Sequence, residues 1–212
     1  MHTQNKEQSV TRLLVATNNP GKVKEYEELL KDLPVEITFP AQEGAVLDVE
    51  ETGLTFEENA RIKALAFAHA TGLLTLADDS GLEVDALDGG PGVYTKRYAG
   101  PDAGDEDNNS KLLRELEGLP PEERGARYQC VLAYWEPASG DEPVFRDGQF
   151  EGRIASERRG TGGFGYDPIF EPEDEAPGGR TVGQMSADEK HALSHRGKAA
   201  RAMAEYLRGE GW

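Results

Sequence analysis

The segment Arg12-Leu13-Leu14-Val15-Ala16-Thr17-Asn18-Asn19-Pro20-Gly21-Lys22 decides the fold of this chain. Its apolar part, from Arg12 to Thr17, predicts a buried strand, and the Asn-Asn-Pro-Gly sequence that follows is typical of a break. A helix is expected from about Lys22 to Asp32 and a second strand from Val35 to Phe39. Because strand, loop, helix and strand follow in this order, the segment predicts the start of an α/β sheet.

The middle of the chain contains clear helix signals and a short apolar run. Thr55 and Glu58 fit a capping box and Gly72 fits a helix stop, so a helix is expected between them. The run from Leu73 to Ala77 predicts a strand that ends before Asp78-Asp79-Ser80-Gly81.

Further elements are expected towards the C-terminus. A helix is predicted from Asn109 to Leu116, after a solvated acidic loop that lacks the glycine and the closing glutamate of a calcium site. Two strands, from Ala126 to Trp135 and from Pro143 to Ile154, are expected to form a hairpin apart from the first sheet. A second capping box at Ser186 starts a helical stretch that runs towards Arg208, with an interruption near Gly197.

The composition restricts the class of partner and the compartment. The net charge of -17 disfavours a nucleic-acid polymer, although a few cations in one pocket can still bind a small anion. The only cysteine, Cys130, excludes an intramolecular disulfide, and its apolar neighbours predict a buried thiol. No stretch approaches the ~20 apolar residues of a membrane span. We expect a cytoplasmic protein with a flexible tail at residues 1–11 and one domain of two lobes at residues 12–212.

The segment from Thr17 to Lys22 is a candidate anion site. Backbone amides at a strand-to-helix junction point outwards, and the helix dipole and Lys22 both favour an anion. The segment is not the usual phosphate loop, because Ala16 and Val23 occupy two of the positions that define that motif. Taken alone, an ordinary turn with a solvated lysine explains it equally well.

Asp78 and Asp79 are candidate ligands of a hard cation such as Mg²⁺, which needs substrate phosphates to complete its octahedron. Alternation along a strand sends the two carboxylates in different directions, so one is expected to face the site and the other to support the loop. A plain Asp-Ser-Gly turn is the alternative.

Two more segments are candidates for ligand contact. Lys63 shares a helix face with apolar residues, so its ammonium is expected either to reach solvent or to meet an anion. Gly162 to Pro168 places aromatic side chains between glycines, which lets a flat ligand approach and stack. The alternative is a tight structural turn with a core phenylalanine.

Six segments in the same order resemble one family, the inosine triphosphate pyrophosphatases, also called non-canonical purine nucleoside triphosphate pyrophosphatases. They are Ala16 to Lys22, Glu51 to Lys63, Ala77 to Leu82, Pro91 to Tyr94, Gly162 to Pro168, and Met185 to Gly197. The resemblance implies an α/β homodimer of two-lobed subunits. Each subunit has a mixed sheet with helices around it and an active-site cleft between the lobes.

The resemblance also implies residue roles. Asp79 would be the general base and a magnesium ligand, with Glu51 as a further ligand of Mg²⁺. The triphosphate would lie against Thr17, Asn18, Asn19, Pro20, Gly21, Lys22, Lys63 and Lys190, and Ser80 would also contact the substrate. Phe164, Gly165, Tyr166 and Asp167 would hold base and sugar, while His195 and Arg196 would read the purine edge. Asn18, Lys96 and Gln184 depart from the family pattern, which leaves the fine substrate preference open.

The expected activity is hydrolysis of ITP, dITP and XTP to monophosphate and pyrophosphate, which removes them from the nucleotide pool. Two other functions stay open. One is a pyrophosphatase of modified pyrimidine nucleotides, and the other is a nucleotide sensor without catalysis. The pair Asp78-Asp79 beside three lysines favours catalysis, since binding alone needs no base.

Overall fold

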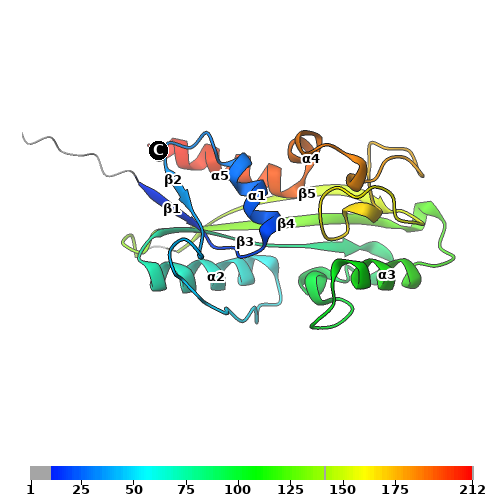
Figure 1. Ribbon diagram of the computed structural model, residues 1–212, viewed down its shortest axis with the longest axis horizontal. Helices are drawn as coiled ribbons and strands as arrows, with labels where there is room; N and C mark the ends of the chain where they lie inside the picture. The colour runs from blue at the N-terminus through cyan, green and yellow to red at the C-terminus, as the bar shows by residue number, and fades with distance from the viewer. Residues whose placement is uncertain (1–10, 141, 212) are drawn as a thin grey trace, which may run out of the picture.

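The computed structural model describes residues 11–140 and 142–211, which form one mixed six-stranded sheet with helices on both faces (Figure 1). The strand order is β2-β1-β3-β4-β5-β6, and β2, β1 and β3 are parallel whereas the remaining pairs are antiparallel. The strands are β1 (Arg12–Val15), β2 (Glu36–Thr38), β3 (Leu74–Val84), β4 (Gly125–Trp135), β5 (Val144–Ile154) and β6 (Phe170–Pro172). The predicted mixed α/β fold is confirmed.

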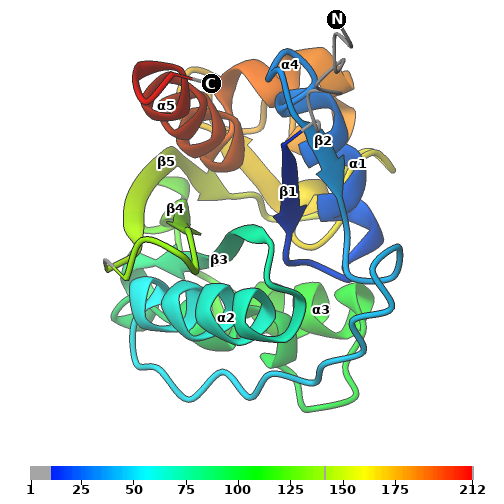
Figure 2. The same ribbon diagram turned by 90° about the vertical axis from the view of Figure 1, so that its left-hand side faces the viewer.

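The helices form a layer on each side of the sheet. They are α1 (Pro20–Leu29), α2 (Phe56–Thr71), α3 (Asp105–Glu115), α4 (Ala187–Leu193) and α5 (His195–Gly209). Helices α1, α4 and α5 cover one face, and α2 and α3 cover the other (Figures 1 and 2). Five short 3₁₀ helices connect these elements: η1 (Asp85–Leu87), η2 (Gly92–Arg97), η3 (Pro121–Glu123), η4 (Asp167–Ile169) and η5 (Val182–Gln184).

Three apolar clusters divide the molecule into two lobes. In the first lobe, one cluster joins the sheet to α1 and α5, and another joins it to α2. In the second lobe, the far ends of β3, β4 and β5 pack against α3 and β6. Cys130 is fully buried in the first lobe, and burial raises the pKa of its thiol to about 12, as expected for a structural cysteine.

Two predictions about the sheet are wrong. Strand β3 does not end before Asp78 but continues to Val84, because β4 pairs with it from Thr75 to Val84 and satisfies its backbone groups along this length. For the same reason the hairpin of β4 and β5 is not separate from the first sheet but is its continuation.

Several helix ends differ from the sequence prediction. Helix α1 begins at Pro20, because the Asn19 side chain caps it. The expected acidic loop at Asp105 is the first turn of α3, where negative side chains favour the helix dipole. The final helical stretch breaks at Ser194, which caps α5, and not at Gly197. The capping box and the glycine stop of α2 are confirmed.

Two further predictions concern chain organisation. The tail expected at residues 1–11 lies, apart from Thr11, outside the described residues. A single domain over residues 12–212 stays a prediction, which a sheet shared by both lobes supports. In the described part of the chain, no helix combines the length and the apolar character needed to cross a membrane.

The sheet is incomplete along one edge of β3. Strand β4 covers one edge over almost its whole length, but β1 pairs with the other edge only from Leu74 to Leu76. Beyond Leu76, no strand of the sheet pairs with this edge of β3 at Asp78, Asp79 and Ser80. This opening lies between the two lobes.

Candidate active site

A cavity of about 500 Å³ lies at this opening. It brings together nearly all the residues that the sequence predicted for the site. These are Thr17, Asn18, Asn19, Pro20, Lys22, Glu51, Lys63, Asp79, Ser80, Phe164, Gly165, Tyr166, Asp167, Lys190, His195 and Arg196. Gly21 is the exception. It packs behind the cavity wall, where an added Cβ would lie 2.7 Å from the Phe164 ring.

The candidate anion segment, Thr17 to Lys22, already forms hydrogen bonds between its own residues. The Asn19 side-chain oxygen accepts hydrogen bonds from the backbone amides of Gly21, at 2.9 Å, and Lys22, at 3.3 Å. The ammonium of Lys22 lies 2.8 Å from a carboxylate oxygen of Asp78. The structure therefore places Lys22 at the cavity but shows that two of the expected free amides are capped.

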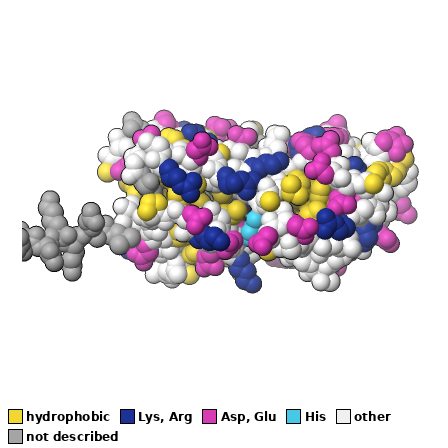
Figure 3. Space-filling model, turned by 90° about the horizontal axis from the view of Figure 1, so that it is seen from above, with side chains coloured by type: hydrophobic (Ala, Val, Ile, Leu, Met, Phe, Trp, Pro, Cys, Tyr) yellow, Lys and Arg dark blue, Asp and Glu magenta, His cyan; other side chains and the backbone are white. Residues whose placement is uncertain are grey.

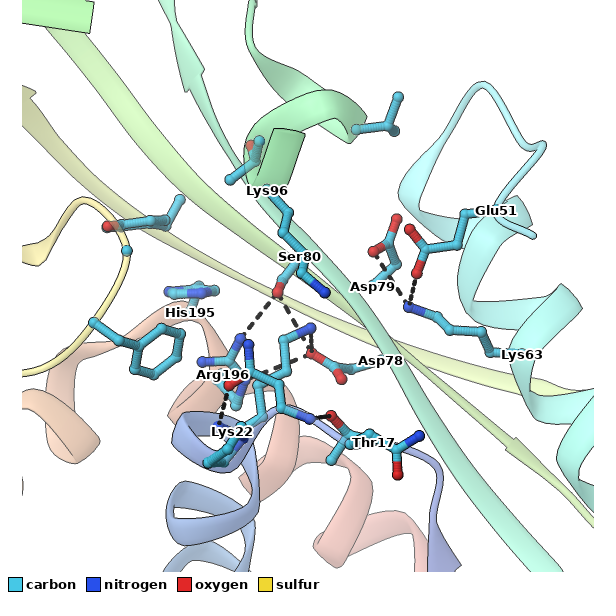
Figure 4. Close-up of a pocket in the computed structure, with 18 of the residues that line it drawn as sticks. Thr17, Lys22, Glu51, Lys63, Asp78, Asp79, Ser80, Lys96, His195 and Arg196 are labelled. Carbon is cyan, nitrogen blue, oxygen red and sulfur yellow. Dashed lines mark hydrogen bonds and ion pairs between the residues drawn. The ribbon is translucent and has the colours of Figure 1, made fainter. Parts of the chain in front are cut away.

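Asp78 and Asp79 point to opposite faces of β3, as strand alternation predicts (Figure 4). Asp78 faces Lys22 and Arg196 on the α1 and α5 side. Burial opposes its ionisation, but Lys22, Arg196 and Lys63 outweigh burial and hold the pKa of this carboxyl well below its usual range. Asp78 is therefore a permanent counter-ion of the cations on that side.

Asp79 lies on the α2 side, in a different environment. Its carboxylate accepts a hydrogen bond from Asn59, at 3.1 Å, and lies 3.4 Å from the ammonium of Lys63. Burial raises the pKa of Asp79, and the nearby Glu51 adds to this effect, while Lys63 opposes it. A carboxylate with a raised pKa is a better proton acceptor than an exposed one, as a general base requires.

Glu51 and Lys63 complete this side of the cavity. The Lys63 ammonium lies 2.8 Å from Glu51, so it meets carboxylates and does not reach solvent (Figure 4). In the described residues no group of three or more His, Cys, Asp or Glu could hold a metal ion. Two carboxylates nevertheless fit the chemistry of Mg²⁺, which binds proteins through one or two carboxylates together with substrate phosphates. Glu51 and Asp79, which both lie beside Lys63, could supply such a pair.

The opposite wall of the cavity is formed by the loop from Gly162 to Asp167 and by α5. Asp167 holds the loop, because its carboxylate accepts from the Phe164 amide at 2.9 Å and pairs with Lys190 at 2.6 Å. Gly165 is fixed by hydrogen bonds to Asp105 and Asn109 of α3. The aromatic side chains of this loop are therefore presented to the cavity by a rigid support.

His195 is buried and stacks on Tyr128, with ring centroids 4.7 Å apart. Burial lowers its pKa far below the usual range, and the charges of Arg196 and Lys190 lower it further. The ring is therefore neutral at pH 7. Among the described residues its buried Nδ1 has no hydrogen-bond partner, which is unusual for a buried polar atom.

Glu25 was not among the site residues predicted from the sequence, although it contacts cations of both α4 and α5. Its carboxylate lies 2.8 Å from Lys190 and also accepts a hydrogen bond from Arg196. Burial opposes its ionisation, but Arg196 and Lys190 hold the pKa of Glu25 below its ordinary value. The available signal was its spacing, since Glu25 follows Lys22 by one helical turn and shares its face.

We expect Glu25→Gln to destabilise the fold, because two buried cations lose their shared anion. The cost is about 3 kcal/mol in the free energy of unfolding near pH 7. A lowered pKa in the folded state means that the stabilisation by Glu25 is complete above the unfolded value of 4.5. It is lost as the pH falls through the folded value. The difference between wild type and variant should therefore shrink below about pH 4.5.

Urea unfolding at several pH values measures this difference. Glu27→Gln is the matched control, because Glu27 lies on the exposed face of the same helix. Equal stability of Glu25→Gln and wild type at pH 7 would show that Glu25 does not compensate the two cations.

Comparisons with known proteins identify the family of this chain. The Ham1 family model matches residues 13–206. The dITP/XTP pyrophosphatase of Yersinia pseudotuberculosis is 48% identical over 198 residues, which cover 93% of this chain and 98% of that protein. The dITP/XTP pyrophosphatase of Thioalkalivibrio sulfidiphilus is 49% identical over 199 residues, with 93% and 99% covered.

The solved structures give the same result. A HAM1 protein from Coxiella burnetii superposes with a TM-score of 0.84 at 42% identity, over 94% of this chain and 99% of that one. The Ham1 protein of Staphylococcus aureus has a TM-score of 0.82 at 38% identity, with 94% and 100% covered. The match spans both lobes and therefore the cavity between them. The chain belongs to the Ham1 family.

Proposed function

We propose that this protein hydrolyses non-canonical purine nucleoside triphosphates, namely ITP, dITP and XTP, to the monophosphate and pyrophosphate. Removal of these compounds from the nucleotide pool is the consequence. The observation that carries the proposal is the cavity at the open edge of β3. There, a proton-accepting carboxylate, Asp79, shares one space with Lys22, Lys63, Lys190 and an aromatic wall. The relatives named dITP/XTP pyrophosphatase support the same substrates.

Cleavage at the α-phosphorus needs an attacking water, a proton acceptor and cations for the leaving pyrophosphate. We assign the proton acceptor to Asp79, whose raised pKa favours that role. We assign binding of the leaving pyrophosphate to Lys22, Lys63 and Lys190, with Thr17 to Pro20 and Ser80 at the same end. Their ammonium groups neutralise the charge that develops on the departing oxygens.

Magnesium is the metal that we propose for this site. Glu51 and Asp79 would hold Mg²⁺ through hard carboxylate oxygens. When bound, the ion supplies charge neutralisation on phosphate oxygens. The proposal is supported by the position of the two carboxylates beside one cation, the Lys63 ammonium.

The wall at Phe164 to Asp167 is assigned to base and sugar, with His195 and Arg196 at the purine edge. Arg196 can only donate hydrogen bonds, and it already donates to Glu25 and to Ser80. A 6-carbonyl oxygen would accept from a donor at this edge, whereas the 6-amino group of adenine would leave the donor unpaired. This difference, about 1–3 kcal/mol for each unpaired group, is the basis for rejecting ATP.

Two rival functions make different predictions. A nucleotide sensor would need the cations and the aromatic wall but no buried proton acceptor, so Asp79 favours the enzyme. A pyrimidine pyrophosphatase would share the phosphate end and differ at the base wall. A substrate panel separates these cases.

The homodimer, the cytoplasmic location and the absence of a nucleic-acid partner stay predictions. The dimer rests on the family resemblance. On the face shown in Figure 3, basic side chains are interspersed with acidic ones, which is unlike a surface for a phosphate backbone. The molecular mass in solution, measured by light scattering, tests the dimer, and the mass of a single chain would contradict it.

The central prediction is the product. With Mg²⁺, the protein should release pyrophosphate from dITP, ITP and XTP, and turnover should fall steeply with ATP and with modified pyrimidine triphosphates. Coupled detection of pyrophosphate measures this, with removal of the metal by a chelator as the control. Release of orthophosphate with a diphosphate product would show that cleavage does not occur at the α-phosphorus.

Asp79→Asn should lower turnover by about 10²–10⁴-fold, because the amide keeps the size of the side chain but loses its basicity. Equilibrium binding of the nucleotide should remain measurable. Asp147→Asn is the matched control, since Asp147 is exposed on β5 and does not line the cavity. Near-normal turnover of Asp79→Asn would remove this residue from the role of base.

A further inference from the structure

Lys96 lies at the cavity on the second lobe, at the end of η2. The backbone on either side of it is fixed, because the Tyr166 hydroxyl donates to the carbonyl of Thr95 at 2.8 Å and the Asn108 amide donates to that of Lys96 at 3.1 Å. The side chain points from η2 into the cavity, towards Ser80 and Asp79 (Figure 4). A fixed backbone therefore directs a flexible cation at the centre of the site.

The other cations of the cavity are already paired with carboxylates. Lys22 lies 2.8 Å from Asp78, Lys63 lies 2.8 Å from Glu51, and Lys190 lies 2.6 Å from Asp167. Arg196, which also lines the cavity, pairs with Glu25. Lys96 differs, because it forms no ion pair with a described carboxylate of the chain.

The charge balance of the cavity shows why the difference between Lys96 and the paired cations matters for binding an anion. Five basic and five acidic side chains line the cavity, and His195 is neutral. A triphosphate carries several negative charges into this space. The paired lysines must share their charge between the substrate and their carboxylates, whereas the ammonium of Lys96 is free to contact phosphate oxygens.

We propose that Lys96 is a substrate-binding residue of the polyphosphate group. Its ammonium contacts phosphate oxygens from the second lobe, while Lys22 contacts them from the first. The inference rests on the proposed function and adds a fourth lysine to the phosphate end. The assignment is to the phosphates and not to the base, because the side chain points to Ser80 and Asp79 and away from the Gly162 to Asp167 loop (Figure 4).

Kinetics with three variants test this role. Lys96→Met removes the charge and keeps most of the length, and Lys96→Arg keeps the charge. Lys24→Met is the control, because Lys24 is exposed on α1 and does not line the cavity. We expect Lys96→Met to lower kcat/KM for dITP by about 3- to 30-fold, mainly through KM, since the group is partly screened by solvent. Lys96→Arg should retain most of the activity and Lys24→Met all of it.

Calorimetry separates the phosphate end from the base end without turnover. Inorganic tripolyphosphate and inosine are titrated into wild type and Lys96→Met, both with Mg²⁺. Weaker tripolyphosphate binding with unchanged inosine binding supports the inference. Unchanged tripolyphosphate binding overturns it, and so does a loss confined to inosine.

The two proposals fail in distinguishable ways. Wild type that releases no pyrophosphate from any purine triphosphate contradicts the proposed reaction, while the tripolyphosphate titration still decides the role of Lys96. Normal turnover of wild type together with an unchanged KM in Lys96→Met contradicts only the role of Lys96.

Discussion

The arrangement of the cavity and its side chains depends on the unequal pairing of the two edges of β3. One edge of this strand is covered by β4 almost to its end, while β1 covers the other edge from Leu74 to Leu76 only. Strand β4 therefore supports β3 along one side, while the other edge has no strand beside it at Asp78 to Ser80; further along, Glu83 forms a bridge with Pro91. At such an edge, side chains from opposite faces of the sheet reach one cavity, and this is how Asp78 and Asp79 serve the same site from different sides. A strand paired along the whole of both edges could not offer both faces in this way.

Charge compensation follows from this geometry. Carboxylates and ammonium groups are costly to bury singly, so each face of β3 has its own set of pairs. On one face Asp78 holds Lys22, and on the other Glu51 and Asp79 hold Lys63. The pairs keep the lysines extended towards the cavity before any anion arrives. The two carboxylates that we propose for Mg²⁺ are the same two that hold Lys63.

The sequence predicted those features that depend on neighbours in the chain. The capping box at Thr55, the stop at Gly72 and the order of helices and strands are local signals, and the structure confirms them. Features that depend on distant partners were missed. The predicted strand ended before Asp78 because the residues that follow are polar. Nothing in the neighbouring sequence indicates that β4 pairs with this part of β3. Glu25 was overlooked because its partner Arg196 lies 171 residues further along the chain.

The contact between Gly21 and Phe164 explains how the two lobes hold one substrate. Gly21 lies in the first turn of α1, within the candidate anion segment, and Phe164 lies in the loop that we assign to the base. Because Gly21 has no side chain, the ring packs directly on the helix, where a Cβ would lie 2.7 Å away. Asp167 fixes the Phe164 amide from behind and pairs with Lys190, so the ring has little freedom to withdraw. The contact therefore joins the loop that we assign to the base directly to the helix that begins in the candidate anion segment.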